Sequence, residues 1–286
     1  MTKPGDLIAV ESPTYHGLIN AVKQSGRNLI EIPTDSSDGI NLAALSLALE
    51  ELPVKAVVVS SSVQNPLGCS MDDNNRKALI HLANEHRITV IEDDTHGELL
   101  YARHRQPNLK AVDTQERVVT CGSFSKTLAP ELRTGWLDAG RWTEQALEFK
   151  RAVSQRSGLL VQQAIARHMS EGHYDRHIRL SRDVYAKRGR ALRKLIAKVF
   201  PEGTLISQPS GGFQLWVEMP KRYSAMALAE YALSKDIAIA PGKLFSNRGH
   251  YGHCVRLCYS NYHEEQGASI ELMGEWLGEW SGGLDS

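Results

Sequence analysis

The chain lacks the features that would place it outside the ordinary globular proteins. Lysine plus arginine balance aspartate plus glutamate at 33 each, so no net charge favours nucleic acid or an anionic membrane. Only four cysteines occur, and their spacings match neither a zinc motif nor a disulfide scaffold. No apolar run approaches the ~20 residues of a membrane span, and no signal region follows Met1. We therefore expect a cytoplasmic protein that acts on a small substrate, with no metal site, membrane or nucleic-acid partner among these residues.

The first part of the chain alternates short apolar runs with helical patterns. We expect helices at 15–24, 42–52 and 73–86, and strands at 7–11, 28–32, 55–60, 88–92 and 117–121. Strands separated by helices pair in parallel, because the connecting helix returns the chain to the same edge of the sheet. The fold class is therefore α/β, with a mostly parallel, doubly wound sheet and helices on both faces.

The pattern changes after about residue 140. Long helical stretches follow at 143–153, 159–171 and 174–199, and then short strands alternate with two more helices. This predicts a large domain at 1–172 and a smaller α+β domain at 173–286, joined by a long helix.

Polar residues follow three of the expected strands. Asn65 lies in the segment after the third strand, Asp93 and Asp94 follow the fourth, and the segment 123–126 with Arg133 follows the fifth. Ligands of an open α/β sheet bind beyond the carboxyl ends of its strands, so we expect these groups to gather on one rim. A lysine for an aldehyde, an acid for a ring nitrogen, and hydroxyls with an arginine for a phosphate suit pyridoxal phosphate.

The same blocks carry a family resemblance. Asn-Pro-Leu-Gly at 65–68, Glu-Asp-Asp at 92–94 and Ser-Phe-Ser-Lys at 123–126 resemble the signature blocks of fold type I, class I/II aminotransferases. Matching segments also occur at 11–17, 211–213, 241–242 and 255–257. The variant Gln-Asn-Pro-Leu-Gly, with Glu-Ser-Pro-Thr-Tyr upstream, is similar to the aminotransferase-like half of MocR-type regulators, which couple a GntR-family winged helix to this domain.

The resemblance implies two catalytic residues. Lys126 would form the Schiff base with pyridoxal phosphate and carry the proton between substrate and cofactor. Asp94, in preference to its neighbour Asp93, would pair with the pyridine nitrogen and keep it protonated.

Further residues are implied to bind cofactor or substrate. His96 stands near the position where many relatives have a tyrosine that donates to the phenolic oxygen. Arg256 would bind the substrate α-carboxylate through its planar fork of donors. The remaining cofactor-binding residues are Tyr15 on the ring face, Asn65 at the phenolic oxygen and toward the substrate, and Ser123, Ser125 and Arg133 at the phosphate.

The implied function is amino-group transfer between an α-amino acid and a 2-oxo acid in a homodimer. Two alternatives stay open: a cofactor and amino-acid sensor domain of a MocR-type regulator with vestigial turnover, and an inactive fragment. Family members have a longer stretch of this domain before the block at Glu11, so we expect an N-terminally truncated copy whose sheet lacks its first strand. DNA binding would then require a winged helix outside these residues.

Two other patterns have plainer interpretations. His173 and His177 lie one helical turn apart, but no acidic or thiol side chain completes a metal site beside them in the sequence. The segment 174–199 is rich in arginine and lysine, which is typical of the solvated face of a long helix.

Overall fold

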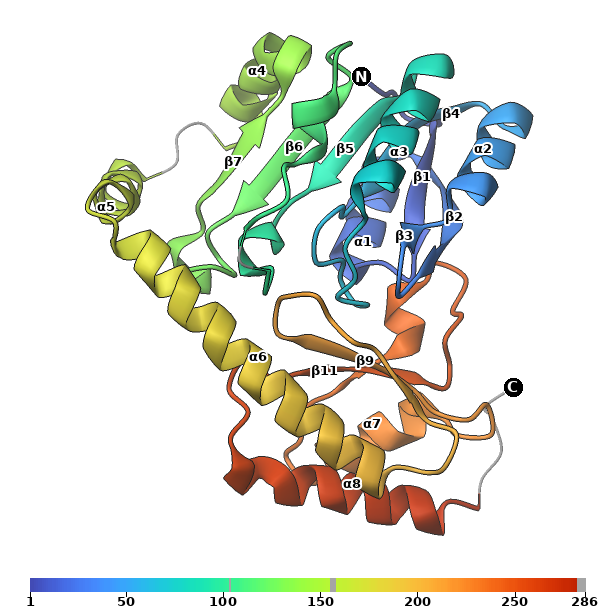
Figure 1. Cartoon of the computed structure of the whole chain (residues 1–286). Helices are drawn as coiled ribbons and strands as arrows, with labels where there is room; N and C mark the ends of the chain where they lie inside the picture. Colours follow the sequence, from blue (N-terminus) through green and yellow to red (C-terminus); the bar gives the residue numbers. More distant parts are fainter. Residues whose placement is uncertain (103, 155–157, 282–286) are drawn as a thin grey trace.

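The computed structural model describes residues 1–102, 104–154 and 158–281. A seven-stranded sheet with helices on both sides forms one part of the molecule, and a four-stranded sheet with its helices forms the other (Figure 1). The helix α6 (His173–Val199) connects the two parts and runs along the small one.

The large sheet has the strand order β3-β2-β1-β4-β5-β6-β7. The five strands from β2 to β6 in that order are mutually parallel, whereas β3 and β7 are antiparallel to their neighbours at the two edges. The strands are β1 (Leu7–Ser12), β2 (Asn28–Asp35), β3 (Gly39–Ile40), β4 (Val54–Val59), β5 (Thr89–Asp93), β6 (Val118–Ser123) and β7 (Gly135–Asp138).

Helices cover both faces of the central strands. α1 (His16–Gln24) packs Leu18 and Val22 on one face, and α2 (Leu42–Glu51) and α3 (Asp73–Glu85) form the main apolar core with the other. Asn41 and Asp72 begin α2 and α3 by accepting a backbone N–H three residues on, which satisfies a donor that has no partner inside the helix. The central strands are therefore buried on both sides, as their apolar sequences require.

The β7 edge of the sheet is different. All four residues of β7 are exposed, with Trp136 at 40% and Leu137 at 54%. The helix α4 (Thr143–Val153) that follows has no buried residue, and α5 (Leu159–Ser170) buries only Ile165. This flank therefore presents apolar side chains that the rest of the described chain leaves uncovered.

The small domain is an antiparallel sheet packed against helices. Its strands, in spatial order, are β10 (Ala240–Pro241), β11 (Cys254–Cys258), β9 (Gln214–Glu218) and β8 (Leu205–Ile206). α6, α7 (Ala225–Leu233) and α8 (Gly267–Glu279) enclose a core of mainly aliphatic and aromatic side chains with this sheet. Short 3-10 helices lie at Gly97–Leu99, Leu109–Val112, Pro130–Leu132, Gly140–Trp142, Gly242–Phe245 and Glu264–Gln266.

The expected fold class is confirmed. Each strand predicted for the large domain is present within a few residues, and the sheet is mostly parallel with helices on both faces. The short edge strands β3 and β7 were not expected from the sequence. The proposed division between residues 172 and 173 falls where α6 begins. Within the described ranges, no helix is both long and apolar enough to span a bilayer.

Candidate functional site

The carboxyl rim of the large sheet faces the small domain. The Arg256 guanidinium on β11 donates to Asn65 Oδ1 over 3.4 Å, and the Thr14 N–H donates to the carbonyl of Phe245 at 2.9 Å. The hydroxyls of Ser12 and Tyr251 lie 3.1 Å apart. Asn65 and Arg256, two of the predicted residues, therefore meet at the seam between the two domains.

A tight turn presents Lys126 at the end of β6. The Ser125 N–H donates to Ser123 Oγ at 3.1 Å, and the Leu128 N–H donates back to the Phe124 carbonyl at 2.8 Å. These bonds fix the turn and leave the Lys126 side chain exposed.

Two hydroxyls and a guanidinium adjoin this turn. Arg133 Nη1 lies 3.4 Å from Ser125 Oγ, and the Arg133 backbone has a left-handed φ of 45° that is uncommon outside glycine. Arg133 is exposed, so its guanidinium remains accessible beside Ser123 and Ser125. Fixed hydroxyls next to an exposed arginine form a suitable phosphate cradle.

The alternation of side chains along β5 separates its carboxylates. Glu92 faces the α3 side of the sheet, where Thr120 Oγ1 donates to it at 3.0 Å. Asp93 pairs with Cys121 on β6 and points to the opposite face, because successive strand residues alternate.

Asp94 returns to the Glu92 side. Its carboxylate is paired with Arg105, which also pairs with Glu98. Burial raises the pKa of Asp94 to about 6, and the Arg105 charge opposes part of that rise. The residue predicted to pair with a ring nitrogen therefore already has a cationic partner on the far side of the strand from Asp93.

Asp93 shares its surroundings with His96 and Lys126. Burial lowers the pKa of His96 to about 4, the Asp93 charge opposes this change, and the charges of Lys126 and Arg256 add to it. His96 is therefore neutral near pH 7 and has a single ring N–H to donate. Its ring packs edge-on against Phe213, with centroids 5.6 Å apart.

Arg256 is held among aromatic residues. Its guanidinium carbon lies 5.1 Å from the centre of the Phe245 ring, and burial lowers its pKa. His16 is near enough for the Arg256 charge to lower its pKa, in addition to the larger effect of burial. Tyr15 stands edge-on to His16 at 4.7 Å and is 41% exposed.

Three buried polar atoms of this seam have no hydrogen-bond partner in the described part of the chain: His96 Nε2, Arg256 Nε and His16 Nδ1. Buried donors and acceptors are almost always satisfied in folded proteins, so a cluster of unsatisfied ones marks a place built for a ligand. The three atoms come from elements far apart in the sequence; the Arg256 charge acts on both histidines, and the Lys126 charge acts on His96.

The structure thus gathers most of the residues chosen from the sequence. Asn65 and Arg256 are in contact, and Ser125 and Arg133 adjoin the Lys126 turn. The exception is Asp94, whose environment differs from the expected one. His16 was not identified from the sequence, and no local pattern in the sequence favours Asp93 over Asp94.

Comparison with known families gives a match over most of the chain. The family model described as aminotransferase class I and II matches residues 1–268. An HTH-type transcriptional regulator, YjiR of Escherichia coli K12, is 38% identical over 96% of this chain and 58% of its own length. The chain therefore spans a little over half of that relative.

Solved structures give the same result. The kynurenine aminotransferase of Pyrococcus horikoshii, determined with PMP, superposes with a TM-score of 0.91 at 31% identity, over 97% of this chain and 70% of that one. LysN, the α-aminoadipate aminotransferase of Thermus thermophilus, gives 0.90 at 28% identity over 97% and 72%. That structure contains N-(5'-phosphopyridoxyl)-L-leucine.

Proposed function

Because the chain belongs to the aminotransferase class I and II family, we propose that it binds pyridoxal phosphate and transfers an amino group between an α-amino acid and a 2-oxo acid. The single observation that carries this proposal is the exposed Lys126 at the end of β6, near His96, whose buried Nε2 has no hydrogen-bond partner among the described residues. The chain covers only part of its relatives' length, so the activity of these residues needs a direct test.

The residues present fit this cofactor. Lys126 would hold its aldehyde, and Ser123, Ser125 and Arg133 would hold its phosphate. Asn65 and the neutral His96 would contact the phenolic oxygen, and the exposed Tyr15 ring would lie on the ring face. Once bound, pyridoxal phosphate supplies an electron sink that stabilises negative charge at the substrate Cα.

Arg256 would then bind the substrate, and Lys126 would transfer its proton. Among the described residues Arg256 Nε has no hydrogen-bond partner, and the guanidinium would orient the α-carboxylate, because a planar guanidinium binds a carboxylate through two parallel bonds. The Lys126 amine would take the proton from the substrate Cα, which Arg256 positions, and would later donate it to the cofactor.

We assign the ring-nitrogen partner to Asp93 in place of Asp94. Asp93 lies on the strand face that also carries Cys121, and its charge acts on His96. Asp94 is already paired with Arg105 on the opposite face. A second cation at Asp94 would share a carboxylate that already pairs with an arginine, whereas the Asp93 side chain bonds only the Thr95 N–H, at 3.0 Å, among the described residues.

A second function is favoured by one specific observation. The 38% identical relative is an HTH-type transcriptional regulator, so the same residues could serve as a cofactor and amino-acid sensor with little turnover. Homodimerisation belongs to both proposals, as does a cytoplasmic location. Stoichiometric cofactor with no measurable conversion of any amino acid would favour the sensor.

Borohydride reduction followed by peptide mapping tests the lysine assignment. We expect the pyridoxyl group on Lys126 in the wild-type chain and no covalent label in Lys126→Ala. Lys150→Ala, which removes an exposed lysine on α4, is the matched control and should retain full labelling. Label on another lysine in the wild type would overturn the assignment.

A further inference from the structure

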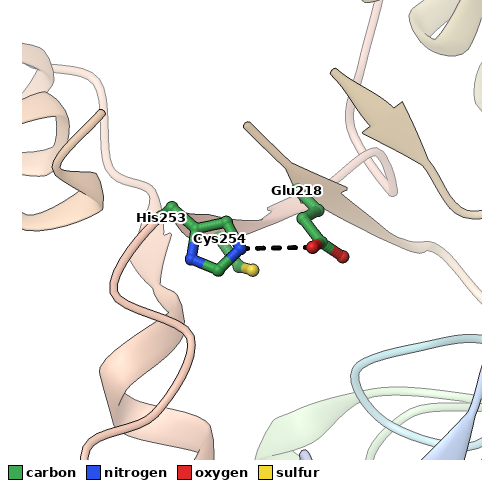
Figure 2. A group of neighbouring side chains, drawn as sticks. All are labelled: Glu218, His253 and Cys254. Atoms are coloured by element: carbon green, nitrogen blue, oxygen red, sulfur yellow. Dashed lines mark hydrogen bonds and ion pairs between the residues drawn. The ribbon is translucent and has the colours of Figure 1, made fainter. Parts of the chain in front are cut away.

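A second group of ligand-type side chains lies in the small domain, at the ends of β9 and β11. Glu218 is the last residue of β9 and pairs directly with Cys254, the first residue of β11. His253 precedes Cys254. Figure 2 shows the His253 ring beside the Cys254 sulfur and facing the Glu218 carboxylate. None of the three belongs to the seam described above.

Their ligand atoms are close together. His253 Nε2 lies 3.2 Å from Glu218 Oε1, and the sulfur, ring nitrogen and carboxylate oxygen all lie within 4.8 Å of one another. In the described part of the chain this is the one group of three such side chains. Zinc bonds of about 2.0–2.1 Å to nitrogen and oxygen place those atoms roughly 3.3 Å apart in a tetrahedral site. The observed nitrogen–oxygen separation of 3.2 Å is close to this value, and the sulfur lies within 4.8 Å of both atoms.

The backbone holds the three residues in place. The Met219 N–H donates to the His253 carbonyl at 3.0 Å, and the Cys254 N–H donates to the Tyr251 carbonyl at 2.9 Å. Cys254 is buried beside Trp216 and Phe245, which encloses the sulfur on its inner side. The His253 and Glu218 side chains are 17% and 44% exposed, which leaves a path from solvent.

We propose that Glu218, His253 and Cys254 bind a zinc ion, with a water molecule in the fourth position. One sulfur, one imidazole and one carboxylate suit zinc, whereas magnesium and calcium prefer oxygen ligands alone. The Cys254 thiol gives its proton to solvent as the zinc–sulfur bond forms. The ion would tie the end of β9 to the start of β11, two residues before Arg256. Cysteine spacing could not reveal this site, because Glu218 is distant in the sequence.

Zinc retention and X-ray absorption on the full chain test the proposal. After dialysis against zinc in the presence of a competing chelator, we expect one ion per chain. Its spectrum should show one sulfur at about 2.3 Å with nitrogen and oxygen at about 2.0–2.1 Å. Cys254→Ser should remove the sulfur signal. His253→Gln and Glu218→Gln should each weaken binding at least tenfold.

Matched variants control for other thiols and histidines. Cys258→Ser removes the exposed cysteine of the same strand, and His173→Gln removes one of the two exposed histidines near the start of α6. Both variants should leave the zinc affinity and the sulfur signal unchanged. Should Cys254→Ser not fold, the partly exposed His253→Gln still decides the question. A wild-type chain that retains no zinc, a spectrum without sulfur, or a signal lost with Cys258→Ser would overturn the proposal. None of these outcomes depends on the labelling of Lys126.

Discussion

Buried polar groups lie on both faces of β5 at the sheet rim, but the two faces differ in how many of these groups have hydrogen-bond partners. On the α3 face, Glu92 accepts bonds from Ser61, Thr120 and the Leu109 N–H. Beside it, Arg76 donates to three backbone carbonyls and to the side chains of Ser61, Ser62 and Gln106. On the other face, buried atoms of His96 and Arg256 have no partner within the described chain.

This contrast distinguishes structural from functional charge. A network in which every donor and acceptor is paired rigidifies the rim and leaves no hydrogen-bonding group for a ligand. The unsaturated face keeps its hydrogen-bonding capacity open, at a cost in stability that a bound ligand would relieve. We therefore expect substitutions on the first face to change folding and those on the second to change cofactor chemistry.

The largest effect is expected from Arg76→Met. This change removes the positive charge beside Glu92 and leaves several buried carbonyls and hydroxyls without their donor, which should lower the free energy of unfolding by about 3–5 kcal/mol. Denaturant unfolding measures this loss of stability. Lys77→Met, which changes the exposed neighbour on α3, is the control. Equal stability of the two variants would show that the network is not structural.

Next in size is the difference between two adjacent carboxylates. Asp93→Asn should slow the half-reaction about 10²–10³-fold, equivalent to roughly 2.7–4 kcal/mol of lost electrostatic stabilisation. Asp94→Asn should change the rate much less and act mainly on stability, since its partner is Arg105. Single-turnover rates under saturating cofactor compare them. The reverse order would restore Asp94 as the partner of the ring nitrogen.

The pH dependence of stability tests a third buried acid. Burial raises the pKa of Glu11 to about 8, so the folded chain binds a proton there that the unfolded chain releases near pH 4.5. Stability from this group is therefore present below pH 4.5 and is lost as pH rises to 8.

Glu11→Gln removes that titration. The free energy of unfolding of the variant, relative to that of the wild type, should increase by up to about 1.4 kcal/mol per pH unit as the pH rises from 4.5 to 8. The exposed Glu50→Gln is the control, and it should show no such slope. A flat difference between pH 5 and 8 for Glu11→Gln would contradict a raised pKa.

The smallest effect concerns His96. His96→Phe keeps the ring contact with Phe213 and removes one donor, so cofactor affinity should fall by about 1 kcal/mol, or roughly fivefold. His96→Tyr retains a hydroxyl donor and should bind at least as well as His96→Phe. Titration of cofactor absorbance measures both, with the exposed His81→Phe as control. No loss in His96→Phe would remove His96 from the site.

The sequence predicted much of this arrangement because it depends on local pattern. Apolar periodicity located the central strands, and the order of strand ends placed Asn65 and Lys126 on one rim. Asp93 and Asp94 could not be separated in this way, because Glu92 gives no sign in the sequence of which face it occupies. The hydrogen bonds that Glu92 accepts from Ser61 and Thr120 show which face of the sheet it occupies.

Other features depend on tertiary contacts that no local signal predicts. Arg105 reaches Asp94 from a loop, and His16 meets Arg256 across the domain seam. The pairing of Glu218 with Cys254 follows from strand register in the small domain. β7 has only four residues, which is too short to show the alternation by which a strand is recognised in a sequence. The left-handed backbone of Arg133 lies just before it.

The helix α6 sets a fixed distance in this molecule. Its 27 residues span about 40 Å. Near its start, the His177 ring bonds the Thr127 carbonyl beside Lys126. Its later turns pack against α8, beneath the strand that carries Arg256. One inserted residue in the middle of α6 would advance the small domain by about 1.5 Å and turn it by roughly 100°. Arg256 would then no longer face Lys126. The number of residues in a helix that contributes no group to the chemistry is thus as much a part of the site as the lysine.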